Sequence, residues 1–303
     1  MNIIWVVLIF FIVSFISPGE RCNKIFDFVQ TNLRFVALKI GDFQMPRKWN
    51  IFAWLERLKI SRWYKISSVG WLLFSVYWFS LLSEYFEGDD YVNVVLTVLV
   101  GFLCILIAIR IIGDDKEGLW KSLTMWVTIS GLIYLPFSEI PVLKDTLISI
   151  VTNQTVSLLE LFGVHTQLVS ATNTILLNGL SVEIVLGCTA IESMAFFAGL
   201  IFCVNAPLKR KLLAFIFVPI IYIANLFRNS FVIYAYGNQL FQFGVLGSSY
   251  ESFFWAHNVI AKIFSLTIVI ILAYATFKIL PEFLSLVEEF IESLFSSKKR
   301  KYL

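Results

Sequence analysis

The sequence has little charge for its length. Only 15% of its 303 residues are Asp, Glu, Lys or Arg, whereas 58% are hydrophobic. A soluble globular domain carries about a quarter charged residues, so this composition excludes one. The net charge of +3 is small, and the basic residues are clustered, which argues against nucleic-acid binding. Several apolar runs instead approach the ~20 residues that a helix needs to cross a bilayer. The composition therefore predicts an all-α polytopic membrane protein.

The sequence is also poor in metal-binding residues. It has two histidines and four cysteines, and no two of the cysteines form a CxxC motif. This scarcity argues against a zinc or redox framework, and we expect neither a metal ion nor an organic cofactor. Cys104 and Cys203 lie inside apolar segments and are expected to be small packing residues.

Seven apolar segments predict seven transmembrane helices. They cover, approximately, residues 2–17, 67–84, 91–112, 119–137, 188–204, 212–235 and 257–279. The first segment has neither a basic region before it nor a small-residue cleavage site after it. It is therefore predicted to be a retained anchor and not a signal peptide.

The distribution of lysine and arginine orients these helices. Residues 20–66 hold ten of them, and the loop at 205–211 is also basic. By contrast, the loops at 85–90 and 236–256 contain none. Because basic loops remain in the cytoplasm, we predict an N-terminus outside the membrane and a C-terminus inside.

This topology divides the chain into five predicted parts. They are an N-terminal anchor with a basic, amphipathic cytoplasmic segment (1–66), three transmembrane helices (67–137), an external segment (138–187), a core of three transmembrane helices (188–280) and a basic cytoplasmic tail (281–303). Within the external segment, Asn178-Gly179 separates two runs rich in β-branched residues. An Asn-Gly pair in that context predicts a β-hairpin.

Three reactive side chains are predicted at one depth in the membrane. Cys188 and His257 each open a segment that runs inward from the outer face. Arg228 lies on the segment between them, 17 residues after Lys211 of the basic loop, which is about 25 Å of helix. All three side chains are therefore expected near the outer interface.

The chemistry of such a group is that of covalent catalysis. A thiol at a helix N-terminus meets the positive end of the helix dipole, which favours the reactive thiolate. An arginine inside a span costs about 2.5–3.5 kcal/mol on insertion scales and is a functional candidate by default. Its donors can hold a carbonyl or an oxyanion. A histidine can accept the thiol proton and return it to a leaving amine.

Four further residues are candidates for supporting roles. Asn225 shares a helical face with Arg228 and is expected to orient its guanidinium, with Asn229 directly after it. Glu192, one turn beyond the cysteine, is expected to pair across the bundle or to position its helix. Lys262 is a second cationic candidate for the position otherwise given to His257.

Each reactive residue also has a simpler interpretation. Cys188 alone would be an apolar packing residue. Arg228 would extend to the interface and bind lipid phosphate. His257 would cap its helix at the interface. The shared depth of the three favours the functional interpretation.

Three ordered motifs carry a family resemblance. The stretches "CTAIESM", "PLKRKLLAFIFVPIIYIANLFRNSFVIYAYG" and "ESFFWAHNVIAKIFSL", within roughly residues 180–282, resemble the exosortase/archaeosortase family, and most closely its archaeosortase branch. The resemblance implies a cysteine transpeptidase of the cell membrane with its active site at the external face. It maps the family's cysteine to Cys188, its arginine to Arg228, and its third catalytic position to His257, with Lys262 as the alternative.

The same resemblance implies the substrate and the acceptor. The substrates would be secreted surface proteins with a C-terminal tripartite signal, of the Pro-Gly-Phe type, and a membrane lipid would receive the new C-terminus. Two other functions stay open at this point. One is an intramembrane cysteine protease that transfers nothing, and the other is a non-enzymatic lipid-binding or transport scaffold. Transport is disfavoured because no paired, broken helices occur in matching halves of the chain.

Overall fold

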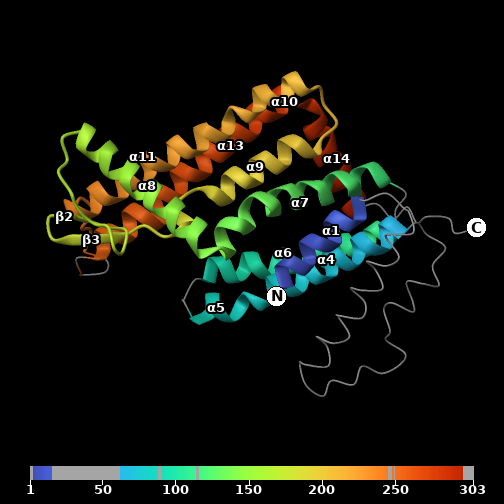
Figure 1. Cartoon of the computed structure of the whole chain (residues 1–303), viewed down its shortest axis with the longest axis horizontal. Helices are drawn as coiled ribbons and strands as arrows, with labels where there is room; N and C mark the ends of the chain where they lie inside the picture. Colours follow the sequence, from blue (N-terminus) through green and yellow to red (C-terminus); the bar gives the residue numbers. More distant parts are fainter. Residues whose placement is uncertain are drawn as a thin grey trace, which may run out of the picture. The chain divides into compact units, whose positions relative to one another are not determined.

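The computed structural model describes residues 3–15, 62–87, 91–113, 116–244, 248 and 250–295. Most of these residues are helical, as the composition predicts (Figure 1). Contacts between residues divide the chain into two compact units, one comprising Met1–Thr124 with Glu289–Leu303 and the other Met125–Glu288. Every candidate site residue belongs to the second unit.

The first unit is a group of packed apolar helices. It contains α1 (Ile3–Phe15), α4 (Arg62–Ser80), α5 (Leu82–Glu87), α6 (Tyr91–Gly113) and the first residues of α7. Helix α4 contacts both α1 and α6. The ring of Phe11 packs on Trp71 with 5.4 Å between centroids, and the hydroxyl of Ser68 donates to the carbonyl of Ala108. Aromatic packing and a hydrogen bond from a buried hydroxyl group thus join these helices.

The second unit carries the remaining elements. Its helices are α7 (Glu117–Glu139), α8 (Pro141–Leu161), α9 (Ile191–Cys203), α10 (Leu208–Phe215), α11 (Phe217–Gly237), α12 (Tyr250–Phe253), the π-helical segment η3 (Phe254–Ile260), α13 (Ala261–Ile279) and the first turns of α14 (Pro281–Phe295). Helix α11 contacts α9 and α13 along its length (Figure 1). It is therefore the central helix of the site described below.

Four helices in the described part of the chain are long and apolar enough to cross a membrane. They are Ile66–Glu87, Asn93–Gly113, Leu208–Gly237 and Tyr250–Ile279. Helices α7 and α8 make a fifth candidate if they are counted together, although they meet at an angle of 91°. Proline cannot continue the hydrogen bonding of a preceding helix, and it favours an extended residue before it. Ile140, just before Pro141, is extended accordingly.

The predicted number of seven crossings exceeds the four or five candidates that qualify by length and composition among the described residues. Helices α1 and α9 have 13 residues each, or about 20 Å of helix, against a hydrocarbon core of about 30 Å. Seven crossings and the orientation of the termini therefore stay predictions. The predicted amphipathic segment at 22–66 lies almost wholly outside the described residues, as does the basic end of the tail.

The predicted hairpin around Asn178-Gly179 is confirmed. Strands β2 (Thr174–Leu177) and β3 (Leu180–Glu183) pair antiparallel, and Leu177 faces Leu180 across the turn. Asn178 and Gly179 have φ of 53° and 82°, the positive values that a two-residue type I′ turn requires. A third strand, β1 (Gln167–Val169), pairs with β2. The all-α prediction missed β1, and helix α8 was likewise not expected within residues 138–187.

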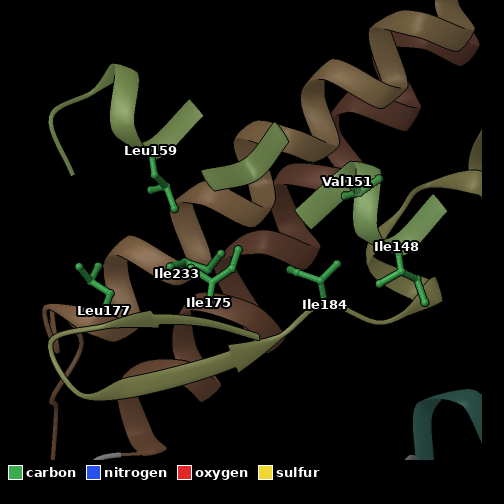
Figure 2. Packing of buried hydrophobic residues seen from close by; sticks show 7 residues of the cluster. All are labelled: Ile148, Val151, Leu159, Ile175, Leu177, Ile184 and Ile233. Atoms are coloured by element: carbon green, nitrogen blue, oxygen red, sulfur yellow. The ribbon is translucent and has the colours of Figure 1, made fainter. Parts of the chain in front are cut away.

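A hydrophobic cluster attaches this sheet to the helices. It is formed by residues of α8, β2 and α11 together with the segment after β3, namely Ile148, Val151, Leu159, Ile175, Leu177, Ile184 and Ile233 (Figure 2). At the hairpin tip, the amide of Asn178 donates to the carbonyl of Gly237 at 3.2 Å. Cys188 packs against the edge of the cluster. The sheet therefore supports the segment that leads into the candidate site.

Helices α7 and α9 approach each other closely at Gly199. A Cβ atom on this glycine would lie 2.2 Å from the Ser130 hydroxyl and 2.7 Å from the backbone carbonyl of Trp126. In the same contact, the indole of Trp126 donates to the carbonyl of Phe196 at 3.1 Å. Small residues allow helices to meet in this way inside a membrane.

We expect Gly199→Ala to lower the free energy of unfolding by about 1–3 kcal/mol, the usual cost of overpacking. The cost arises because a backbone carbonyl cannot move aside without shifting α7. Thermal unfolding in detergent measures it. The control is Gly118→Ala, since a Cβ there meets nothing within 4 Å. Equal unfolding midpoints for the two variants would contradict the close approach.

Candidate active site

Helix α11 presents three polar side chains on one face. Asn225, Arg228 and Asn229 are separated by three and four positions, the spacing that places residues side by side on a helix. Asn229 is buried, and Asn225 and Arg228 are half-buried. Polar groups withdrawn from solvent need hydrogen-bond partners, and these three find them on two other segments.

Cys188 ends a short 3₁₀ turn that leads into α9. The turn spans Leu186–Cys188, and α9 begins at Ile191. The helix thus starts three residues later than the predicted span, so the thiol precedes the helix and is not in its first turn. Ala190, between them, is left-handed with φ of 62°. This sharp change of direction turns the chain from the sheet into α9.

The carbonyl oxygen of Cys188 accepts two hydrogen bonds from α11. Asn225 donates from Nδ2 at 2.7 Å, and Asn229 donates from Nδ2 at 2.8 Å. A carbonyl oxygen has two lone pairs, so both are used. Asn225 was expected to orient the guanidinium of Arg228, but it holds the cysteine backbone instead. The asparagine that contacts the guanidinium is Asn229.

Arg228 connects Asn229, one of the two asparagines that hold the Cys188 carbonyl, to His257. Its Nη1 donates to Asn229 Oδ1 at 3.3 Å, and its Nη2 lies 3.2 Å from His257 Nε2. The other ring nitrogen of His257, Nδ1, lies 3.1 Å from Oδ1 of Asn258. An unbroken series of hydrogen bonds therefore runs from the Cys188 carbonyl through α11 to the π-helical segment.

The π-helical segment η3 carries His257 and determines the orientation of its imidazole ring. Isolated π-helical turns are rare and occur mostly inside α-helices at functional positions. Here η3 continues without interruption into α13. The ring of Phe253, one turn earlier, stacks on the His257 ring with centroids 5.0 Å apart and planes 7° apart. The imidazole is thus held on one face as well as at both nitrogens.

The two remaining predicted site residues stand outside this hydrogen-bonded series. The carboxylate of Glu192, which is exposed, accepts a hydrogen bond at 3.1 Å from Tyr134 on α7. Lys262 is exposed in the first turn of α13, where its ammonium interacts with His257 only through space. The predicted packing cysteines, Cys104 and Cys203, are buried free thiols.

The sequence analysis missed two residues of the site. Asn258 follows His257 directly, and Phe253 precedes it by four positions. The second spacing is a recognisable helical signal. The first spacing is not, since neighbouring residues on a helix are not expected to face each other, although both Arg228–Asn229 and His257–Asn258 meet in this way in the structure. Among the residues that the structure describes, no group of three or more His, Cys, Asp or Glu could hold a metal ion.

The fold and this arrangement define a multi-pass helical membrane protein in which a thiol, a guanidinium and an imidazole come from three separate segments. The chain belongs to the transmembrane exosortase family, whose model matches residues 49–274. It is 30% identical to archaeosortase A of Haloferax volcanii over 254 residues, which are 74% of this chain and 83% of the relative.

A second relative supports the same assignment. Archaeosortase A of Natronomonas pharaonis is 28% identical over 251 residues, which are 75% of this chain and 79% of the relative. No solved structure matches the chain. Membership in this family implies a role in the processing of sorting signals.

Proposed function

We propose that this protein is a membrane-embedded cysteine transpeptidase. It cleaves a C-terminal tripartite sorting signal, of the Pro-Gly-Phe type, from secreted surface proteins and transfers the new C-terminus to a membrane lipid. The observation that carries the proposal is the hydrogen-bonded series that joins the Cys188 backbone, Arg228 and His257. Apolar packing alone does not require such a series among three segments, whereas thiol chemistry uses a nucleophile, a base and a donor for the oxyanion.

The first half of the reaction forms an acyl-enzyme. His257 takes the proton of the Cys188 thiol, and the thiolate attacks the scissile carbonyl carbon to form a C–S bond and a tetrahedral oxyanion. The oxyanion collapses and the C–N bond breaks. The C-terminal segment leaves as an amine that takes the proton from His257. The substrate remains attached to Cys188 as a thioester.

Arg228 stabilises the negative charge of the tetrahedral intermediate. In the structure its Nη2 lies at hydrogen-bond distance from His257 Nε2, the same atom that must accept the thiol proton. We therefore expect Nη2 to move from the imidazole to the substrate oxygen when the substrate arrives. This exchange frees the base and positions the oxyanion donor in one step, while Nη1 stays on Asn229.

The second half of the reaction releases the product. An amine on a lipid head group attacks the thioester carbonyl, a C–N bond forms and the C–S bond breaks, and the thiol is regenerated with the proton of the attacking amine. Donor and acceptor both reside in the membrane, which raises their effective concentration at the site. The scarcity of basic residues in the loops on one side supports a location in the cell membrane with the site at the external face.

The proposal is tested by co-expressing the full chain with a surface protein that ends in a Pro-Gly-Phe signal and following the substrate's mass. We expect loss of the C-terminal segment with a gain of the mass of a lipid. Cys188→Ala should abolish both changes, and Arg228→Ala and His257→Ala should reduce them at least ~10²-fold. Cys203→Ala is the matched control and should process normally, because this thiol is buried in α9.

Other outcomes separate the alternative functions. Loss of the segment without added mass would show proteolysis and exclude transfer. Processing that survives Cys188→Ala would exclude Cys188 as the nucleophile. A substrate left intact by the unmodified chain would overturn the proposal for this signal and favour a lipid-binding scaffold.

A further inference from the structure

The protonation state of His257 follows from its partners. The guanidinium of Arg228 has only donors and keeps its proton in proteins. Since its Nη2 lies at hydrogen-bond distance from Nε2 of His257, that ring nitrogen is the acceptor and carries no hydrogen. A neutral imidazole has one protonated nitrogen, so the hydrogen is on Nδ1.

Asn258 supplies the acceptor that this tautomer needs. Its Oδ1 lies 3.1 Å from Nδ1 of His257, so the Nδ1 hydrogen has a partner. The same reasoning fixes the orientation of Asn229. Its Oδ1 accepts from the donor-only guanidinium and its Nδ2 donates to the acceptor-only Cys188 carbonyl. Every member of the series thus has one consistent assignment.

We infer that Asn258 is a positioning residue that holds His257 in its neutral, Nδ1-protonated form. Three partners act on the ring at once. Phe253 stacks on its face, Asn258 accepts from Nδ1, and Arg228 donates to Nε2. The ring and its amide partner are both half-buried, so water does not readily replace the Asn258 oxygen. Without that oxygen, the Nδ1 hydrogen loses its acceptor, and only the Arg228 donor at Nε2 still favours this tautomer.

The catalytic consequence rests on the proposed function, whereas the tautomer does not. With the hydrogen held on Nδ1, the lone pair of Nε2 is the one available to accept a proton from the thiol. Two cations, Arg228 on α11 and Lys262 on α13, interact electrostatically with His257. The Asn258 oxygen, as the acceptor of the Nδ1 hydrogen, stabilises the imidazolium that forms when Nε2 accepts the thiol proton.

The tautomer is measured by ¹⁵N NMR of the full chain in detergent after labelling with ¹⁵N-histidine. The chain has only two histidines, and His165→Gln assigns the signals of the other. We expect His257 to show a protonated Nδ1 and an unprotonated Nε2. The opposite pattern in the unmodified protein would overturn the inference, whatever the stability of any variant.

The role of the amide is measured with two substitutions. Asn258→Leu removes the acceptor at similar size, and the share of Nε2-protonated signal should rise at the expense of the Nδ1-protonated signal, although Arg228 still favours the latter. Asn258→Asp keeps an acceptor and should retain the pattern. Asn238→Leu is the control, since among the described contacts its amide bonds to Tyr234 at the end of α11 and to Asn178 of the hairpin, and to no residue of the site. An unchanged spectrum in Asn258→Leu would show that Asn258 does not hold the tautomer.

Processing kinetics complete the test. Asn258→Leu should lower kcat by about 10–100-fold, the effect of removing an outer hydrogen-bond partner from a functional histidine, with KM unchanged and kcat restored in Asn258→Asp. If Asn258 had only a structural role, kcat would not depend on whether the side chain at position 258 can accept a hydrogen bond. If the spectra behave as expected but His257→Ala processes normally, the tautomer stands and the proposed role of His257 fails.

Discussion

Arg228→Lys is expected to lower the rate of processing by about 10²–10³-fold, the usual loss when one oxyanion donor is removed. The substitution keeps the positive charge. It removes the planar fork, whose separate nitrogens reach Asn229 on one side and His257 on the other. A lysine ammonium is a single compact donor group, and it cannot hold both partners while a third interaction forms with the substrate.

The matched control is Arg210→Lys. Arg210 also uses two nitrogens, but its partner is the carboxylate of Glu282 at the start of α14. The same chemical change at this position should leave processing nearly unaffected. Single-turnover cleavage of a signal-bearing substrate gives the rate, and thermal unfolding confirms that both variants are folded. If Arg228→Lys cleaved as fast as Arg210→Lys, charge alone would suffice, and the exchange of donors proposed above would be wrong.

Detaching the Cys188 carbonyl from α11 should have an effect of similar size. Asn225→Leu or Asn229→Leu alone leaves the oxygen with one donor, and we expect each to slow processing by roughly tenfold. The double variant leaves the half-buried Cys188 carbonyl with neither amide. A lost partner of this kind costs about 1–3 kcal/mol, so a loss of 10–100-fold beyond either single variant is expected. The physical reason is that the cysteine segment is no longer held at a fixed distance from Arg228.

A second measurement does not depend on the substrate. In a variant that retains only Cys188 among the four cysteines, the rate of alkylation by iodoacetamide reports access to the thiol and its reactivity. The double Asn→Leu variant should change this rate, and Asn238→Leu should not. Equal alkylation and equal processing in the double variant and its control would show that the two asparagines do not position the thiol.

Local spacing made part of the site predictable. The three- and four-residue intervals between Asn225, Arg228 and Asn229 require a shared helical face, whatever surrounds the helix. The Asn178-Gly179 turn was likewise predictable, because few other residue pairs accept two positive φ angles. In both cases the geometry involves only a few consecutive residues, so no distant contact can alter it.

Longer-range features were not predictable in the same way. The bend of 91° between α7 and α8 depends on Pro141, yet a proline alone does not determine whether a chain turns back or continues. The start of α9 at Ile191 depends on the left-handed Ala190, a conformation that alanine does not prefer. Such local strain persists only where the surrounding structure enforces it.

The sequence by itself determined the class of protein, the positions of most helices and the residues able to carry covalent chemistry, because hydrophobicity and helical periodicity are properties of short segments. Only the tertiary structure decided which atoms meet. It turned Asn225 to the Cys188 carbonyl and Arg228 to His257. Those pairings depend on how the segment of Cys188, α11 and η3 pack, since a hydrogen bond forms only within a few tenths of an ångström of its best length.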